Sequence, residues 1–100
     1  MRRSPSPYSH GRSEIWGRTT LERVIAREQR QLGARLRKLR QNAGLTQEEA
    51  AERIGIHPKH LGRIEGGTVN LTFATLTALA VAYQVKLVGL FDEPSPGDKR

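Results

Sequence analysis

The sequence contains no cysteine. Disulfide bridges, thiolate metal sites and a thiol nucleophile are therefore excluded, as fits a reducing compartment. The first seven residues, MRRSPSP, lack the apolar run of a signal peptide, and no stretch approaches the roughly twenty apolar residues of a membrane span. Aromatic residues make up only 5% of the chain. We expect a soluble, mainly helical, cytoplasmic protein with no membrane partner.

The features of an active site are also missing. No nucleophile is spaced near a base, no glycine-rich phosphate loop is present, and no pair of carboxylates lies in an apolar setting. His57 and His60 have a spacing that can place both imidazoles on one helical face, but no acid or thiol completes the three or four ligands of a tetrahedral zinc site. We therefore expect no enzyme, no cofactor and no metal site.

Positive charge is what the chain has in excess. The formal net charge is +7, which favours a polyanionic partner such as nucleic acid or an anionic surface. Eleven of the 17 Lys and Arg residues lie in the first forty positions, against three acids, whereas acids outnumber bases between residues 45 and 93. Most of the electrostatic attraction therefore comes from the N-terminal part.

The length of 100 residues indicates one domain with tails. Residues 1–18 are rich in Ser, Pro, Arg and Gly and are expected to be a disordered basic tail. Residues 19–29 are expected to form a helical extension, residues 30–93 the globular domain, and residues 94–100 a short polar tail.

The first helix is expected to begin near Thr19, which has capping-box spacing to Glu22, and to continue to about residue 42. Gly33 is a point at which this helix could break into two. The stop is expected at Asn42-Ala43-Gly44, since glycine tolerates the left-handed conformation that ends helices.

Four further helices follow from caps and apolar spacing. Thr46, in a capping box with Glu49, opens a helix over 46–54, and Pro58 opens one over 58–65. Thr72 caps a helix that ends near residue 82, and a short fifth helix covers 87–91. The expected fold is all-α, with these core candidates in the last two helices: Phe73, Leu76, Leu79, Ala80, Leu90 and Phe91.

Helices 46–54 and 58–65 are joined by a tight turn at Gly55 and Ile56, an arrangement typical of a helix-turn-helix. In this geometry the second helix can enter the DNA major groove while the first braces it. The outward face of the second helix is polar and carries His57, Lys59, His60 and Arg63.

The chain resembles the Xre/Cro, lambda-repressor-like family. The resemblance rests on LGARLRKLRQNAGLTQEEAA at 32–51, IGI at 54–56, IEGG at 64–67 and VKLVGLF at 85–91, and it covers about residues 30–92. It implies a five-helix DNA-binding domain, here with an N-terminal basic extension. It also implies a dimeric, sequence-specific transcriptional regulator that reads operator DNA with helix 58–65.

Matched position by position, the resemblance also implies roles for individual residues. The polar face of helix 58–65 would read the bases. The start of helix 46–54 and the loop after 58–65 would contact the DNA backbone, and two further residues would form an ion pair. The base-reading set is His57, Lys59, His60 and Arg63; the backbone set is Thr46, Gln47, Thr68 and Asn70; the structural ion pair is Arg40 with Glu65. Pro58 departs from many relatives because it has no hydrogen-bonding side chain.

Three alternatives stay open at this point. The domain could be an antitoxin or another regulator that mainly engages a protein partner such as a toxin. Arg23 and Arg27 could form a solvated helix face or could contact DNA, since they lie outside the resemblance. The apolar cluster at 87–91 could be core or, in part, a contact between the two copies of a homodimer.

Overall fold

A computed structural model of the chain describes residues 14–92, with side chains from residue 20 onward. Within that range the protein is all-helical and contains no strand. The order is α1 (Glu14–Asn42), α2 (Gln47–Ile54), α3 (Pro58–Glu65), α4 (Phe73–Tyr83) and the 3-10 helix η1 (Leu87–Leu90). The expected polar tail at 94–100, and residues 1–13 of the expected basic tail, lie outside the described residues.

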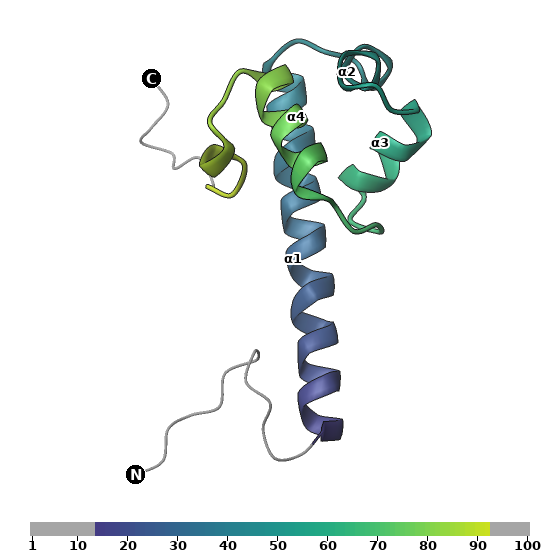
Figure 1. Cartoon of the computed structure of the whole chain (residues 1–100), viewed down its shortest axis with the longest axis vertical. Helices are drawn as coiled ribbons and strands as arrows, with labels where there is room; N and C mark the ends of the chain where they lie inside the picture. Colours follow the sequence, from purple (N-terminus) through teal and green to yellow (C-terminus); the bar gives the residue numbers. More distant parts are fainter. Residues whose placement is uncertain (1–13, 93–100) are drawn as a thin grey trace.

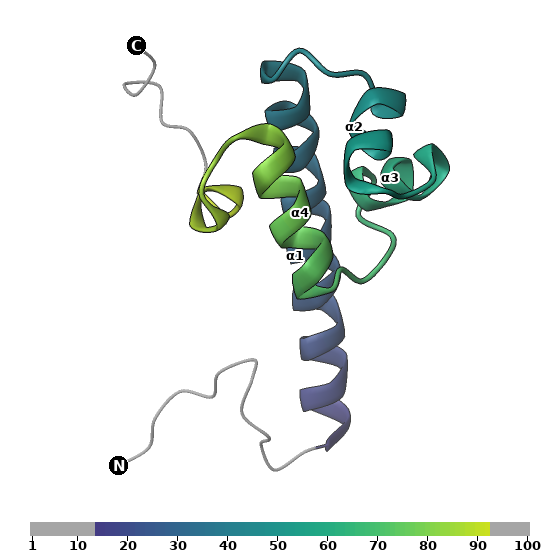
Figure 2. The ribbon, with the colours of Figure 1, turned by 45° about the horizontal axis from the view of Figure 1, so that its top comes forward.

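Helix α1 is the longest element of the structure. Its C-terminal half packs beside α3, α4 and η1, whereas its N-terminal half extends beyond them (Figures 1 and 2). The helix begins at Glu14, so residues 14–18 are helical and not part of a disordered tail, and Thr19 does not cap the helix. A Thr-x-x-Glu pair marks a helix start only if the chain before it leaves helical geometry. Here no proline lies between residues 8 and 57, and a Thr inside a helix costs well under about 1 kcal/mol, so the helix can start before Thr19.

Helix α1 does not break at Gly33, where the sequence allowed a break, and passes through this residue without interruption. Gly33 instead allows close packing. A Cβ atom at this position would lie 2.6 Å from the carbonyl oxygen of Ile64 and 2.5 Å from that of Glu65. The absent side chain therefore lets α1 approach the end of α3.

The caps predicted for the other helices are confirmed. The Thr46 hydroxyl accepts from the Glu49 N–H at 3.0 Å, and the Glu49 carboxylate accepts from the Thr46 N–H at 2.9 Å. Pro58 occupies the first turn of α3, and Thr72 caps α4 by accepting from the Thr75 N–H.

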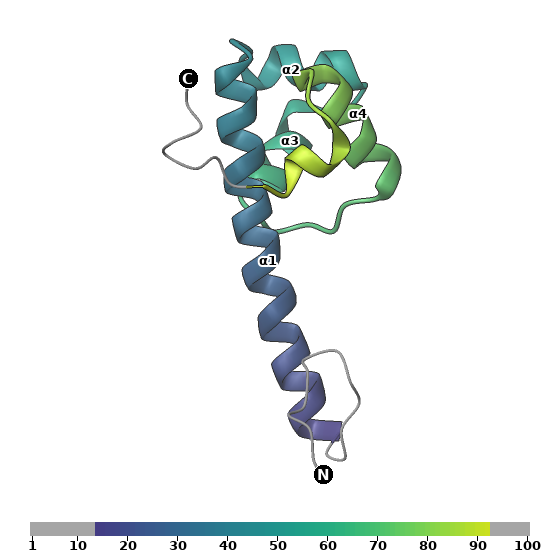
Figure 3. The same cartoon turned by 90° about the vertical axis from the view of Figure 1, so that its left-hand side faces the viewer.

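The expected fifth helix is wrong in type, since residues 87–90 form a 3-10 helix with short-range bonds such as Gly89 N–H to Lys86 O at 2.8 Å. Gly89, in the middle of so short a segment, disfavours an α-helix. This element returns to α1 (Figure 3). Phe73 and Phe91 are also wrong as core candidates, with exposed fractions of 70% and 48%. Each stands at an end of its element, outside the turns that pack.

The core lies between the C-terminal half of α1 and the other helices. Ala50 and Ala51 are fully buried, so the small inner face of α2 permits close approach of the neighbouring helices. The buried apolar residues are Leu36, Leu45, Ala50, Ala51, Leu61, Ile64, Leu79, Ala80, Tyr83 and Leu90. None of the helices between residues 14 and 92 has the length and apolar character to cross a membrane.

Candidate nucleic-acid interface

The turn between α2 and α3 fixes how the two helices meet. Gly55 has φ 79°, a left-handed conformation that glycine adopts without steric cost. The Ala51 carbonyl then accepts from the N–H of Gly55 at 2.8 Å and from that of Ile56 at 3.0 Å, which closes the end of α2. Helices α2 and α3 pack against each other directly after this turn. The residues from Thr46 to Glu65 thus form a helix-turn-helix.

His57 has a structural role that the sequence analysis missed. It is the N-cap of α3, and its Nδ1 accepts from the Lys59 N–H at 3.0 Å. Histidine is not among the preferred N-cap residues, so no local signal indicates this bond. Because Nδ1 accepts, the neutral imidazole carries its proton on Nε2, and Nε2 is the nitrogen that remains to donate.

An open depression of ≈ 580 Å³ lies between the start of α2 and the exposed side of α3. It brings together four predicted contact residues that come from three segments of the chain: Gln47, Lys59, Arg63 and Thr68. Glu48 and Gly62 line the same surface and were not singled out from the sequence. The other four predicted contact residues do not line it: Thr46, His57, His60 and Asn70.

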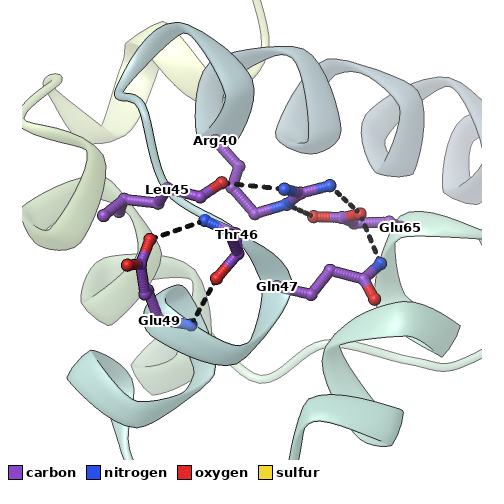
Figure 4. A network of polar contacts seen from close by, with 6 residues as sticks. All are labelled: Arg40, Leu45, Thr46, Gln47, Glu49 and Glu65. Atoms are coloured by element: carbon purple, nitrogen blue, oxygen red, sulfur yellow. Dashed lines mark hydrogen bonds and ion pairs between the residues drawn. The ribbon is translucent and has the colours of Figure 1, made fainter.

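Arg40 and Glu65 form the ion pair that the family resemblance implies, in a network drawn in Figure 4. The Arg40 Nε lies 2.6 Å from Glu65 Oε2, and its Nη2 lies 3.1 Å from Oε1. The remaining Nη1 donates to the Leu45 carbonyl at 2.9 Å. Both charged residues are buried, and the hydrogen bond to Glu65 raises the pKa of Arg40 against the opposing effect of burial. The pair connects α1 to the last residue of α3.

Gln47 is joined to this network through Glu65 (Figure 4). It also lines the depression. Its Nε2 donates to Glu65 Oε1 at 3.0 Å, and the side chain is half-buried. Gly62 lies opposite, where a Cβ atom would be 3.8 Å from both terminal atoms of the Gln47 amide. The amide group is thus held in place, with a second N–H that the bond to Glu65 does not use.

Tyr83 lies in the electrostatic field of this pair. Its side chain is 4% exposed, and its hydroxyl has no hydrogen-bond partner in the part of the chain that is described. Burial, and secondly the Glu65 carboxylate, raise the pKa of Tyr83 to about 12.

The loop after α3 is tied to both neighbouring helices. The Thr68 hydroxyl and N–H both donate to the Arg63 carbonyl, at 3.2 and 3.1 Å. The Asn70 Oδ1 accepts from the Gln29 amide at 2.6 Å. Asn70 therefore holds the loop to α1, a contact between residues 41 positions apart that the sequence does not indicate.

The last part of α1 carries four basic residues of two kinds: Arg35, Arg37, Lys38 and Arg40. The Arg35 Nε donates to the Leu90 carbonyl at 3.1 Å, and Arg40 is buried in its ion pair, so both stabilise the fold. Arg37 and Lys38 are exposed. Across residues 20–92, no three His, Asp or Glu side chains cluster in a way that could hold a metal ion.

Comparison with known proteins agrees with this geometry. Residues 31–90 match the family model described as "Helix-turn-helix domain". The chain is similar to the restriction-modification controller protein C.AhdI from Aeromonas hydrophila, with 34% sequence identity and a TM-score of 0.60. That similarity covers 62% of this chain and 94% of C.AhdI. A search of curated proteins gave no significant match.

Proposed function

The chain belongs to the helix-turn-helix domain family, in the Xre-like group of DNA-binding transcription regulators, and we propose that it reads a specific operator with α3 in the major groove. One observation carries this proposal. Lys59 and Arg63 lie on the same open surface as Gln47 and Thr68, which belong to other segments. Donors for base edges and donors for phosphates are thereby presented together.

Base readout is assigned to α3. Lys59 and Arg63 are both exposed and stand four residues apart, so they share one face of the helix. Both can donate to O6 and N7 of guanine. His57 contributes through Nε2, since its Nδ1 caps the helix. His60, which is half-buried, is the fourth member of the set. Pro58 adds shape but no hydrogen bond.

Contact with the DNA backbone is assigned to α2 and to the loop after α3. Gln47 donates its second amide N–H to a phosphate, and its bond to Glu65 keeps it oriented toward the DNA. The Thr46 hydroxyl is engaged in the cap, so Thr46 acts through the amides of the first turn, where the helix dipole favours an anion. Thr68 and Asn70 hold the loop beside the phosphates.

We further propose that two copies bind a two-fold-related operator. Helix α4 and the segment after it expose four large apolar side chains, Phe73, Val81, Val88 and Phe91, at 70%, 72%, 62% and 48%. Apolar area of this kind is favourably removed from water by a second copy. In the dimer, the two α3 helices lie about 34 Å apart, one turn of B-DNA. A protein partner such as a toxin is the alternative occupant of this surface.

Selection of bound sequences from a random duplex pool tests the proposed readout. Enrichment of two related half-sites, one helical turn apart, is expected, whereas a pool without any enriched site would contradict it. Sedimentation of the wild type and of Val88→Asp tests the dimer. The wild type is expected to dimerise and the variant to be monomeric. A wild type that stays monomeric at all concentrations would instead support the partner-binding alternative.

A further inference from the structure

The outer part of α1, residues 20–30, extends beyond the packed domain and touches it only at its inner end. No residue between 20 and 32 is buried, although the helix is continuous there. Figures 1 and 3 show this part projecting past α2, α3 and α4. The family match begins only at residue 31. Packing in the domain therefore accounts for the inner end of this stretch, at Gln29 and Arg30, but not for residues 20–28.

Three arginines share one side of this segment. Arg23, Arg27 and Arg30 are exposed, and their spacing of four and three residues keeps them within about 60° of one another around the helix. The two acids of the segment, Glu22 and Glu28, fall roughly 100° or more away from the centre of this side. None of the three arginines is in an ion pair with a residue whose side chain is described. We call these three residues the arginine face.

The arginine face begins beside the loop that follows the recognition helix α3. A Cβ atom at Gly67 would lie 2.6 Å from the Cα of Arg30, so the loop backbone rests directly on α1 at this point. Gln29 fixes the same contact from the neighbouring position, through its bonds to Asn70 Oδ1 and to the Val69 carbonyl. The position of the arginine face relative to α3 is therefore fixed by the continuous helix α1 and by the short loop packed on it.

We propose that the arginine face is a second DNA-binding surface, which contacts the phosphates that flank the base pairs read by α3. This inference rests on the proposed function. From Arg23 to Arg30 the helix rises about 10 Å. Over that axial length one strand of B-DNA presents about three phosphates. Arginine suits this role because its planar guanidinium donates to phosphate in a bidentate manner.

Charge also decides between DNA and a second copy of the chain. The protein carries a formal net charge of +7, so two arginine faces brought together would repel each other. Phosphates, in contrast, release condensed counterions when arginines neutralise them, and this release gives affinity without sequence preference. The arginine face would therefore add affinity for any DNA sequence, while sequence specificity would come from α3.

The test uses the full chain and two variants that each lose two positive charges. Arg23→Gln/Arg27→Gln alters the arginine face but keeps Arg30, which touches the loop. Arg53→Gln/Lys86→Gln is the matched control, because both residues are exposed and neither lines the depression. Binding is measured against salt concentration on the selected operator with long flanks and on a scrambled duplex of equal length. Circular dichroism at 222 nm checks that each variant keeps its helices.

The salt slope is the slope of the logarithm of the binding constant against the logarithm of the salt concentration. Arg23→Gln/Arg27→Gln is expected to lower its magnitude by about 1.8, or about 0.9 for each lost phosphate contact. The same variant is expected to weaken binding to both duplexes by the same factor. The control pair is expected to change the slope by less than about 0.5. On a duplex cut back to the half-sites, the arginine-face variant and the wild type are expected to bind alike.

Equal slopes for the two variants on long duplexes would overturn the inference, as would loss of dimerisation by the arginine-face variant at unchanged slope. In both cases a wild type that still selects an operator leaves the proposed function intact. The wild type could also bind all duplexes equally, while Arg23→Gln/Arg27→Gln lowers the salt dependence of binding and the control pair does not. That result would support the arginine face and contradict readout by α3. Binding to no duplex at all would overturn both.

Discussion

Arg40 on α1 holds Glu65 at the end of α3 by two hydrogen bonds, one of 2.6 Å and one of 3.1 Å. The same carboxylate accepts from Gln47 at the start of α2. One buried anion therefore connects α1, α2 and α3. The position of α3 relative to the rest of the domain depends on this connection.

Loss of Arg40 alone is expected to be strongly destabilising. Arg40→Met leaves the Glu65 carboxylate buried without its cation, so the free energy of unfolding should fall by about 3–5 kcal/mol. Arg40→Met/Glu65→Met removes both charges and should recover most of that loss. Urea denaturation measures both variants; a single variant as stable as the wild type would contradict the structural role of the pair.

Gly33 and Gly62 offer a matched pair of glycine substitutions inside helices. Gly33→Ala places Cβ 2.5 Å from a backbone oxygen of Glu65, and the shift that this forces between α1 and α3 should cost about 1–3 kcal/mol. Gly62→Ala meets only ordinary contacts at 3.8 Å and should gain about 0.5–1 kcal/mol from helix propensity. Thermal or urea unfolding measures both. Equal effects would show that α1 and α3 are not as close as described.

Tyr83 makes a prediction about stability at high pH. The pKa of Tyr83 is raised from 10.0 to about 12 in the folded protein. Its ionisation therefore leaves the free energy of unfolding unchanged below pH 10 and lowers it as the pH rises from 10 toward 12. In Tyr83→Phe this part of the decline between pH 10 and 12 should be absent. At neutral pH the variant should gain up to about 1 kcal/mol, since the hydroxyl it removes is buried without a partner. Denaturant midpoints between pH 7 and 12 check both effects; identical pH profiles would contradict the burial of this hydroxyl.

Gln47→Ala is expected to weaken binding to all DNA sequences about equally. Its amide is assigned to a phosphate, and phosphate contacts carry no direct sequence information. Affinities for the selected operator and for single-base variants of it should therefore fall by one common factor. If the loss depended on sequence, Gln47 would have to be reassigned to base readout.

Much of the fold is predictable because its signals are local. Thr46 with Glu49, Pro58 and Thr72 each mark a helix start within one turn of sequence, and Gly55 marks a stop. The start of α1 was predicted too late, because its capping pattern lies inside a longer helix. The use of Gly33 for close packing could not be predicted, because its cause lies more than thirty residues away in α3.

The candidate site divides in the same way. Helical spacing predicted that Lys59 and Arg63 lie on the outward face of their helix, and the family resemblance implied their role. The structure brings both onto one surface with Gln47. The cap formed by His57 was missed, because its imidazole acts through a nitrogen that the sequence does not distinguish. Arg35 is one of the eleven basic residues in the first forty positions, which together predicted attraction to DNA. Its Nε donates to the Leu90 carbonyl, a bond set by tertiary packing alone.

The most direct test of operator reading by α3 is a comparison of the sequences selected by the wild type and by Arg63→Ala from the same random duplex pool. Arg63→Ala should lose about 1–3 kcal/mol on the wild-type operator. Its selected sequences should lose preference at one guanine in each half-site, with the other positions unchanged. An Arg63→Ala pool with the same preference at every position as the wild type would contradict base readout by this face of α3.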